Sequence, residues 1–332
     1  MFEELIEIAR SRLEKNKDSY TYENVLELAT STLITSTREH ESETIKACIT
    51  DEDACVKRNR ERWKSGFQKL RALRETSIQA GMNFQKHFLQ KEEYQHDVLY
   101  GVLMRQHAHA CRISGEIIVL LEAGYADGAI ARWRTLYEIS VTCLIIKKYG
   151  RNAASDYVKH GIVKNSEGIL EYQKTAEAMG LPPFSREEVE AAEKIKEEIT
   201  DGDRSWHWAR RHAGVSKLEK LREIVGLDNW SHNYKLASRN IHSDYYEMDR
   251  LHAMSEAKQD LLLVGQSNSG MTAPAHFTAI NLAIITSVFI LVGSDDDQCE
   301  LDFTDSILFM KVIDNYIDEV GRAFIAIEQR KE

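Results

Sequence analysis

The sequence contains very little proline. Among its 332 residues there are three prolines, Pro182, Pro183 and Pro274, although proline usually makes up about 5% of a protein chain. Proline interrupts helix interiors because it lacks a backbone N–H and clashes with the preceding turn. The alternating β-branched pattern of strands is scarce as well. We therefore expect an all-α fold, a multi-helix bundle with long uninterrupted helices.

Cysteine is rare, and its spacing forms no recognisable pattern. The five cysteines are an odd number, and no Cys-x-x-Cys pair occurs. Neither a disulfide framework nor a zinc cluster fits this arrangement. The first residues, Met-Phe-Glu-Glu, lack the basic start and the apolar run of a signal peptide. We expect reduced, mostly buried thiols and a cytoplasmic location.

Positive charge is in the minority, and long apolar runs are absent. The chain has 43 lysines and arginines against 53 acidic residues, a net charge of −10. Nonspecific nucleic-acid binders are usually basic, so such a function would need a local basic patch. The apolar stretch 277–292 contains polar residues and is shorter than the roughly 20 residues of a membrane span. We expect a buried core helix there and no membrane association.

Apolar residues recur at helical spacing along most of the chain. The expected helices span residues 1–15, 21–48, 52–90, 91–122, 127–149, 152–179, 185–199, 216–225, 230–243, 246–264, 276–292 and 302–329. Gly124 and Gly150 mark helix ends, and Asp127 and Ser185 are suited to N-caps. The first 90 residues are more charged than the rest. We therefore expect a charged N-terminal helical arm over 1–90 and a helical core domain over 91–332.

Arg134 and Glu138 lie four residues apart at the edge of an apolar helical face, so they are neighbours on the helix. A lone buried charge is costly, so the two should pair. The pair either holds the helix register or presents a guanidinium into a cleft. Tyr157 and His160 follow on the next helix, where the histidine is either structural or part of that cleft.

Tyr234, Ser238 and His242 are spaced i, i+4 and i+8, with Arg239 and Asn240 between them. One helical face would carry a phenol, a hydroxyl and an imidazole. Such a set suits the binding of an anion or the transfer of a proton, because histidine titrates near neutral pH. The alternative is a histidine near a helix end whose ring is bonded to a carbonyl.

Aromatic and basic residues alternate in residues 205–212, which include Trp206, His207 and Arg210. This segment suits stacking on bases or closing over a ligand. The alternative is a loop anchored by its tryptophans.

A basic stripe covers residues 57–64. Its members Arg58, Arg60, Arg62 and Lys64 could meet RNA phosphates or an acidic protein partner. The alternative is a solvated face that pairs with nearby acidic residues.

No metal site and no cofactor are expected. Glu93 and His96 match one half of the di-iron pattern, which requires a second Glu-x-x-His, and Asp249 before His252 is the wrong acid. Glycine-rich phosphate loops and the motifs of serine hydrolases and zinc proteases are absent.

The run around Gly124, Ala129, Arg134 and Glu138 resembles the signature helix of a bacterial family, the domain-of-unknown-function family 5677. The later Tyr…Ser…His helix is similar as well, and the resemblance covers roughly residues 95–290. That family is distantly similar to helical abortive-infection proteins and to HEPN ribonucleases, which implies a toxin or antiphage effector that acts on RNA. The chain departs from the HEPN pattern, because no histidine follows an arginine after four to six residues. A nuclease site would have to combine different helices, such as those of Arg134 and His242.

The leading hypothesis is an effector of antiviral defence or stress with a polar cleft formed by Arg134, Glu138, His160 and His242. Arg134 would hold a phosphate and His242 would be the acid and base of a metal-independent ribonuclease. The competing hypothesis is a non-catalytic module that binds a small anionic ligand or a protein partner. Helical proteins with apolar terminal helices often dimerise, so we expect a homodimer.

Overall fold

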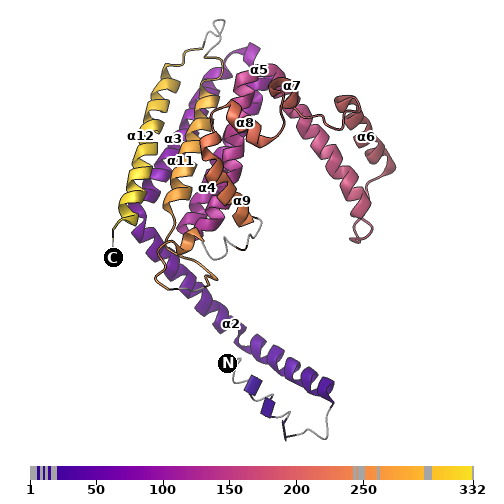
Figure 1. Cartoon of the computed structure of the whole chain (residues 1–332), viewed down its shortest axis with the longest axis vertical. Coiled ribbons are helices and arrows are strands. Elements are labelled where there is room, and N and C mark those ends of the chain that lie inside the picture. The colour runs from indigo at the N-terminus through magenta and orange to yellow at the C-terminus, as the bar shows by residue number, and fades with distance from the viewer. Residues whose placement is uncertain are drawn as a thin grey trace. The chain divides into compact units, whose positions relative to one another are not determined.

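The computed structural model describes residues 6–7, 10–11, 14–15, 21–241, 245, 251–259, 262–294 and 301–330. Within this part of the chain there are ten α-helices and no strand, which confirms the predicted all-α fold (Figure 1). The α-helices are α2 (Tyr22–Arg62), α3 (Lys64–Phe88), α4 (Val98–Glu122), α5 (Ala126–Thr175), α6 (Arg186–Thr200), α7 (Arg210–Ala213), α8 (Leu218–Ile224), α9 (Ser231–Ile241), α11 (Thr272–Ile290) and α12 (Thr304–Glu328). Short 3-10 helices are η1 (Glu92–Tyr94), η2 (Asp228–Trp230) and η3 (His252–Met254).

The chain divides into two compact units, residues 1–58 and 59–332. This division differs from the arm expected over residues 1–90, because α3 belongs to the second unit. One face of α3 is buried there, including Phe67, Leu70, Leu73 and Phe84. The charges that set residues 59–90 apart in composition lie on the other faces of α3, where Lys69, for example, pairs with Glu319 of α12 at 2.5 Å.

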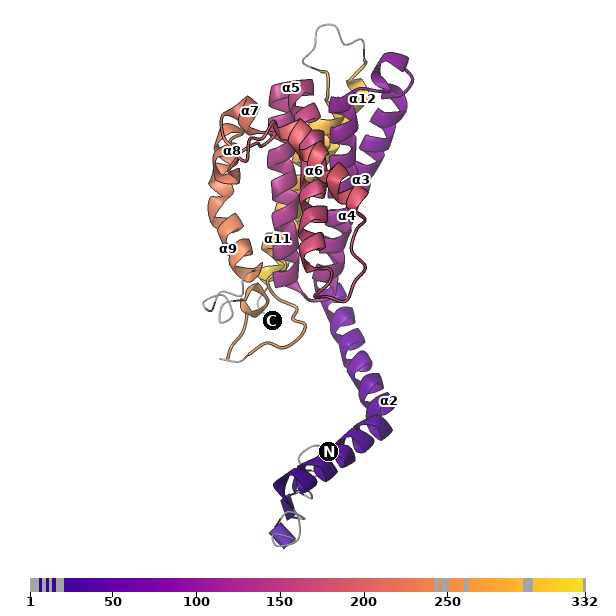
Figure 2. The same cartoon turned by 90° about the vertical axis from the view of Figure 1, so that its right-hand side faces the viewer.

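The core of the second unit is a bundle of α3, α4, α11, α12 and the first half of α5, which run side by side in both views (Figures 1 and 2). α11 contacts each of the other four helices. Several of its polar groups have hydrogen-bond partners inside the bundle. The amide Oδ1 of Asn281, for example, accepts a hydrogen bond from the indole Nε1 of Trp133 at 2.6 Å. Buried polar groups with partners are compatible with a helix core.

By length and composition alone, α11 could cross a membrane, and 67% of its apolar window is buried inside the structure. A single helix of this kind is weak support for a membrane span.

α5 bends sharply at Gly150, whose φ of 72° and ψ of −154° are not helical. Side chains rarely adopt such a positive φ, so glycine suits the position. Beyond the bend, Arg151 donates from Nε to Oδ2 of Asp97 at 2.7 Å, which ties the second half of α5 to the start of α4. The second half then pairs with α6 (Figures 1 and 2). Both predicted helices, 127–149 and 152–179, are therefore present as the two halves of α5.

The predicted caps and boundaries of the helices are correct in some places and wrong in others. Ser185 begins α6 with a capping box, in which Glu188 is the reciprocal partner, as its sequence predicts. Asp127 is not an N-cap, because α5 begins one residue earlier and Tyr125 occupies the cap. The predicted break between residues 48 and 52 is wrong, since no helix breaker lies there and α2 continues to Arg62. The helix predicted over 246–264 falls partly outside the described residues, and within 251–259 there is only η3.

Candidate functional site

Five rings from two segments form one cluster, hereafter the ring cluster: Tyr157, His160, Trp206, His207 and Trp208. The imidazole of His160 stacks on the indole of Trp206, with ring centroids 5.8 Å apart, and its centroid is 4.7 Å from that of His207. Tyr157 meets Trp208 edge to face at 5.0 Å. The structure therefore brings together four residues that the sequence named as candidates on separate segments.

A buried carboxylate anchors the segment that carries these rings. Asp156 is 5% exposed, and its Oδ2 lies 3.0 Å from Nε2 of His212 and 3.4 Å from a terminal nitrogen of Arg211. Lys159 donates to the other oxygen at 3.2 Å. Asp156 was not predicted as a site residue, since an isolated aspartate in a helix carries no motif.

Both histidines of the ring cluster are held neutral at pH 7. Burial first, and then the nearby His160, Lys164 and Arg210, lower the pKa of His207 to about 4. Burial and Lys164 also lower the pKa of His160. His207 accepts at Nδ1 from the backbone N–H of Ala209 at 3.2 Å, so its proton is on Nε2. Nδ1 of His160 is buried, and none of the described residues forms a hydrogen bond with it.

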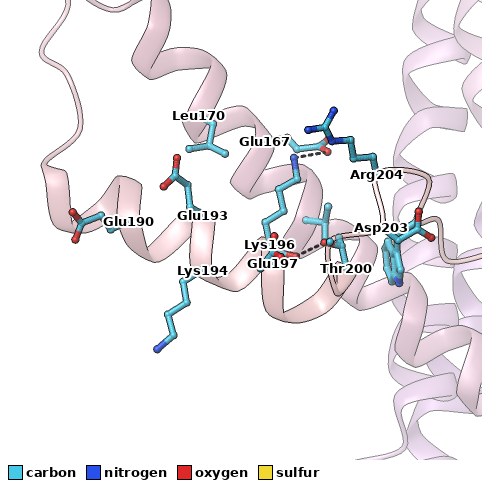
Figure 3. A pocket seen from close by; sticks show the side chains of 13 residues that line it. Glu167, Leu170, Glu190, Glu193, Lys194, Lys196, Glu197, Thr200, Asp203 and Arg204 are labelled. Atoms are coloured by element: carbon cyan, nitrogen blue, oxygen red, sulfur yellow. Dashed lines mark hydrogen bonds and ion pairs between the residues drawn. The ribbon is translucent and has the colours of Figure 1, made fainter.

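A cavity of about 880 Å³ lies between the second half of α5 and α6 (Figure 3). This volume is within the range of ligand pockets, about 300–1,000 Å³. Trp206 lines it as well as stacking on His160, so the ring cluster borders the cavity. The other lining residues are Val163, Glu167, Leu170, Glu190, Glu193, Lys194, Lys196, Glu197, Thr200, Gly202, Asp203 and Arg204.

The charges of this cavity are uneven. Its carboxylates outnumber its cations, and those of α6 lie along one wall (Figure 3). Glu167 is paired with Lys164 at 2.8 Å and with Lys196 at 3.3 Å. An anionic ligand would be repelled by the α6 wall and attracted towards Lys164 and Arg210, beside the histidines.

A second cluster joins Arg134, Glu138 and Tyr234. Nε of Arg134 donates to Oε1 of Glu138 at 3.0 Å and to the Tyr234 hydroxyl at 2.9 Å. That hydroxyl donates to the same carboxylate oxygen at 2.6 Å. Burial and the hydrogen bond to Glu138 raise the pKa of Tyr234 to about 12. The predicted ion pair of Arg134 and Glu138 is confirmed. Tyr234, the first residue of the predicted Tyr…Ser…His face, joins this pair through hydrogen bonds.

The two clusters are separate. Arg134 precedes Gly150 by 16 residues, about 24 Å of helix, whereas His160 follows the bend and contacts Trp206 and His207. The described residues therefore do not form the predicted cleft that combines Arg134 and Glu138 with His160. His242 lies outside the described residues.

The remaining predicted residues of α9 lie beside Tyr234. The hydroxyl of Ser238 donates to the backbone carbonyl of Tyr234 at 2.9 Å, so it is engaged within its own helix. Arg239 is exposed, and the side chain of Asn240 is outside the described part of the chain.

The basic stripe is partly used in internal contacts. Nε of Arg60 donates to Glu122 at 3.1 Å. Arg62 donates to the carbonyl and the side chain of Asn268 at 3.0 and 2.8 Å, and it pairs with Glu256. Arg58, in the first unit, and Lys64, at the start of α3, are exposed. Arg210, from the other predicted segment, donates to the carbonyl of Ser205 at 3.2 Å.

Metal ligands do not gather in the described part of the chain, where no three His, Cys, Asp or Glu side chains lie close enough to hold a metal ion. Searches of curated proteins and of solved structures give no match to this chain. Residues 100–260 match the family model described as "Family of unknown function (DUF5677)". This stretch, slightly less than half of the chain, includes the Arg134 cluster and the ring cluster, and over it the chain is similar to the DUF5677 family.

Proposed function

We propose that the chain is an effector of antiviral defence or stress that cleaves RNA without a metal, and that the ring cluster is its catalytic site. The observation that carries this proposal is the His160–His207 pair, two neutral imidazoles with ring centroids 4.7 Å apart, next to Trp206, which lines a ligand-sized cavity. A pair of imidazoles beside an aromatic platform and two cations is suited to acid–base chemistry on a phosphodiester.

In this proposal His160 is the general base, because its lowered pKa leaves the imidazole unprotonated at pH 7. It takes the proton of the ribose 2′-hydroxyl, and the 2′-oxygen attacks phosphorus to form a cyclic phosphate. The bond from phosphorus to the 5′-oxygen breaks, and His207 donates a proton to that oxygen. The bound phosphodiester supplies the negative charge that raises the pKa of His207 for this step.

Residues around the two histidines are suited to bind the bases and the phosphates of RNA. Trp206 offers an indole on which a base can stack. Lys164 and Arg210, whose charges reach His207, would attract the phosphate. The carboxylates of α6 would keep the RNA backbone on this side of the cavity.

The test compares cleavage of total RNA and transfer RNA by wild-type protein and by H160A and H207A, in the presence of a chelator. Loss of a general acid or base should lower the rate by about 10²–10⁴-fold. H232A is the matched control, because His232 is exposed on α9. The proposal fails if the folded wild type does not cleave, or if H160A cleaves as fast as wild type. RNA binding by wild type without cleavage would favour the non-catalytic module.

A cytoplasmic location is part of this proposal. The four described cysteines, Cys48, Cys55, Cys111 and Cys143, are all free, which fits a reducing compartment.

We also propose a homodimer. Leu308 and Val312 of α12 are about half exposed and line an apolar groove of about 720 Å³ against α3. Light scattering of wild type and of L308E at micromolar concentration tests this assembly. A wild type that is monomeric there would contradict it.

A further inference from the structure

Arg222 is a buried cation with little compensation. It lies in α8, is 6% exposed, and none of the described residues accepts a hydrogen bond from its Nε, which is itself buried. The carboxylate that approaches it, Glu219, is 4.0 Å away and 65% exposed. A buried charge without full compensation destabilises a fold strongly. Among the described residues, the partners of Arg222 are this distant carboxylate and the two tyrosines Tyr137 and Tyr234.

A second guanidinium faces the same ring as Arg222. Cζ of Arg222 is 5.9 Å from the ring centroid of Tyr234, and Cζ of Arg134 is 5.0 Å from that centroid. Arg134 makes both of its hydrogen bonds, to Glu138 and Tyr234, from Nε. The terminal N–H groups of Arg134 form no hydrogen bond with any described residue.

The carboxylates near this pair equal the cations in number, but two of the three are exposed. Nζ of Lys148 lies 3.4 Å from the carbonyl of Ile224, at the end of α8. Glu138 is the carboxylate bound within the cluster. Glu219 and Asp228 are exposed at its margin, and Asp228 is near enough to raise the pKa of Tyr137.

The hydroxyl of Tyr137 lies between this cluster and the backbone. It donates to the carbonyl of Leu227 at 2.8 Å, and the charge of Arg222 and a hydrogen bond from its guanidinium lower the pKa of Tyr137 against the larger effect of burial. A tyrosine hydroxyl is a neutral partner, so it does not neutralise the guanidinium.

We infer that Arg222 and Arg134 form a binding site for a small oxyanion, such as a phosphate or carboxylate group. Guanidinium groups bind such groups through paired N–H donors, and the interaction strengthens where water is excluded. The side open to a ligand is that of Arg134, whose side chain is 26% exposed against 7% for Arg222. This site is distinct from the ring cluster, because it lies before the bend of α5.

The experiment is thermal unfolding of the purified full-length chain during titration with inorganic phosphate or malonate, at an ionic strength held constant with chloride. A ligand of the folded state raises Tm with the logarithm of its concentration. If phosphate alone raises Tm, the site binds a phosphate group, and if malonate alone raises it, the site binds a carboxylate. If both raise Tm, the site accepts either oxyanion. If neither raises Tm beyond chloride, the inference is wrong.

Three variants locate the effect. R222M and R134M should each weaken the affinity for the oxyanion by roughly 30-fold or more, as loss of one partner of a buried charge pair does. K220M is the matched control, because Lys220 is exposed on the same helix and pairs with Glu223 at 2.9 Å; it should bind as wild type does. Without oxyanion, R222M should melt at the same temperature as wild type or higher, since methionine removes an uncompensated charge.

The opposite results would show a structural role. If R222M melts lower than wild type without oxyanion, and R134M still binds the oxyanion with wild-type affinity, Arg222 serves packing and the site does not exist. If R222M does not fold, R134M alone tests the inference, because Arg134 is partly exposed. Retained affinity in R134M then overturns the inference.

Discussion

Gly81 of α3 is the position where a single methyl group gives the sharpest test of the packing. A Cβ added there would lie 2.8 Å from Nδ1 of His107 in α4, and closer still to its Cε1. The His107 ring is 5% exposed and stacks on Phe289 at 5.1 Å, so it has little room to move. The structure therefore predicts a direct conflict between α3 and α4 in the variant G81A.

Two opposing effects set the size of the change. Alanine is better than glycine in a helix by about 1 kcal/mol. Overpacking in a rigid core costs about 1–3 kcal/mol, and a contact this far inside the usual 3.5–4.0 Å is at the upper end of that range. We expect G81A to lower the free energy of unfolding by about 1–2 kcal/mol and Tm by a few degrees.

The matched control is the same substitution where space is open. Gly161 and Gly168 lie in the second half of α5, and a Cβ at either would have no neighbour within 4 Å. G161A and G168A should therefore stabilise by up to about 1 kcal/mol. Urea unfolding followed by circular dichroism measures all three. If G81A stabilises the protein as much as G161A does, the packing of α3 on His107 is wrong.

Three further predictions concern stability and use the same unfolding assay. Asn59 donates to the last two carbonyls of α4 at 2.6 and 2.9 Å, so N59L should cost about 2 kcal/mol, and a neutral result would show that these bonds do not matter. Asp127 accepts from two backbone N–H groups of η3 at 2.8 and 3.0 Å; D127A should cost about 2–3 kcal/mol, and D127N should fall between it and wild type. Burial lowers the pKa of His107 to about 4. Its unfolded form binds a proton more readily, so the free energy of unfolding should drop by up to about 3 kcal/mol as the pH falls from about 6.5 to 4. H107L should show a flatter pH dependence, and an unchanged slope would contradict this.

The sequence predicted features that depend on neighbours along the chain. The spacing of Arg134 and Glu138 is enough to predict their ion pair, since residues four apart are adjacent on a helix. Ser185 with Glu188 predicts a capping box for the same reason. Gly150 predicts the end of the helix that precedes it.

Contacts between distant segments could not be predicted in this way. His160 meets Trp206 across 46 positions, and helical periodicity contains no information about which segment covers a given face. The burial of Arg222 is hidden as well, because a single arginine in a short charged helix usually faces water. For residues 59–90 the high charge suggested a separate arm, although three of these charges, on Arg60, Lys69 and Arg71, form ion pairs with other helices of the bundle.

The bend at Gly150 has a consequence for the way the second unit opens. Residues of α5 before Gly150 lie in the bundle core, so their amides should exchange with solvent only when the whole bundle unfolds. About half of the residues in the second half of α5 are exposed, and this segment is held by α6, the ring cluster and the ion pair of Arg151 with Asp97. Its amides can exchange through local opening of that hairpin, while the bundle stays folded. The two halves of α5 should therefore unfold as separate cooperative units, and the cavity lies entirely in the less stable unit.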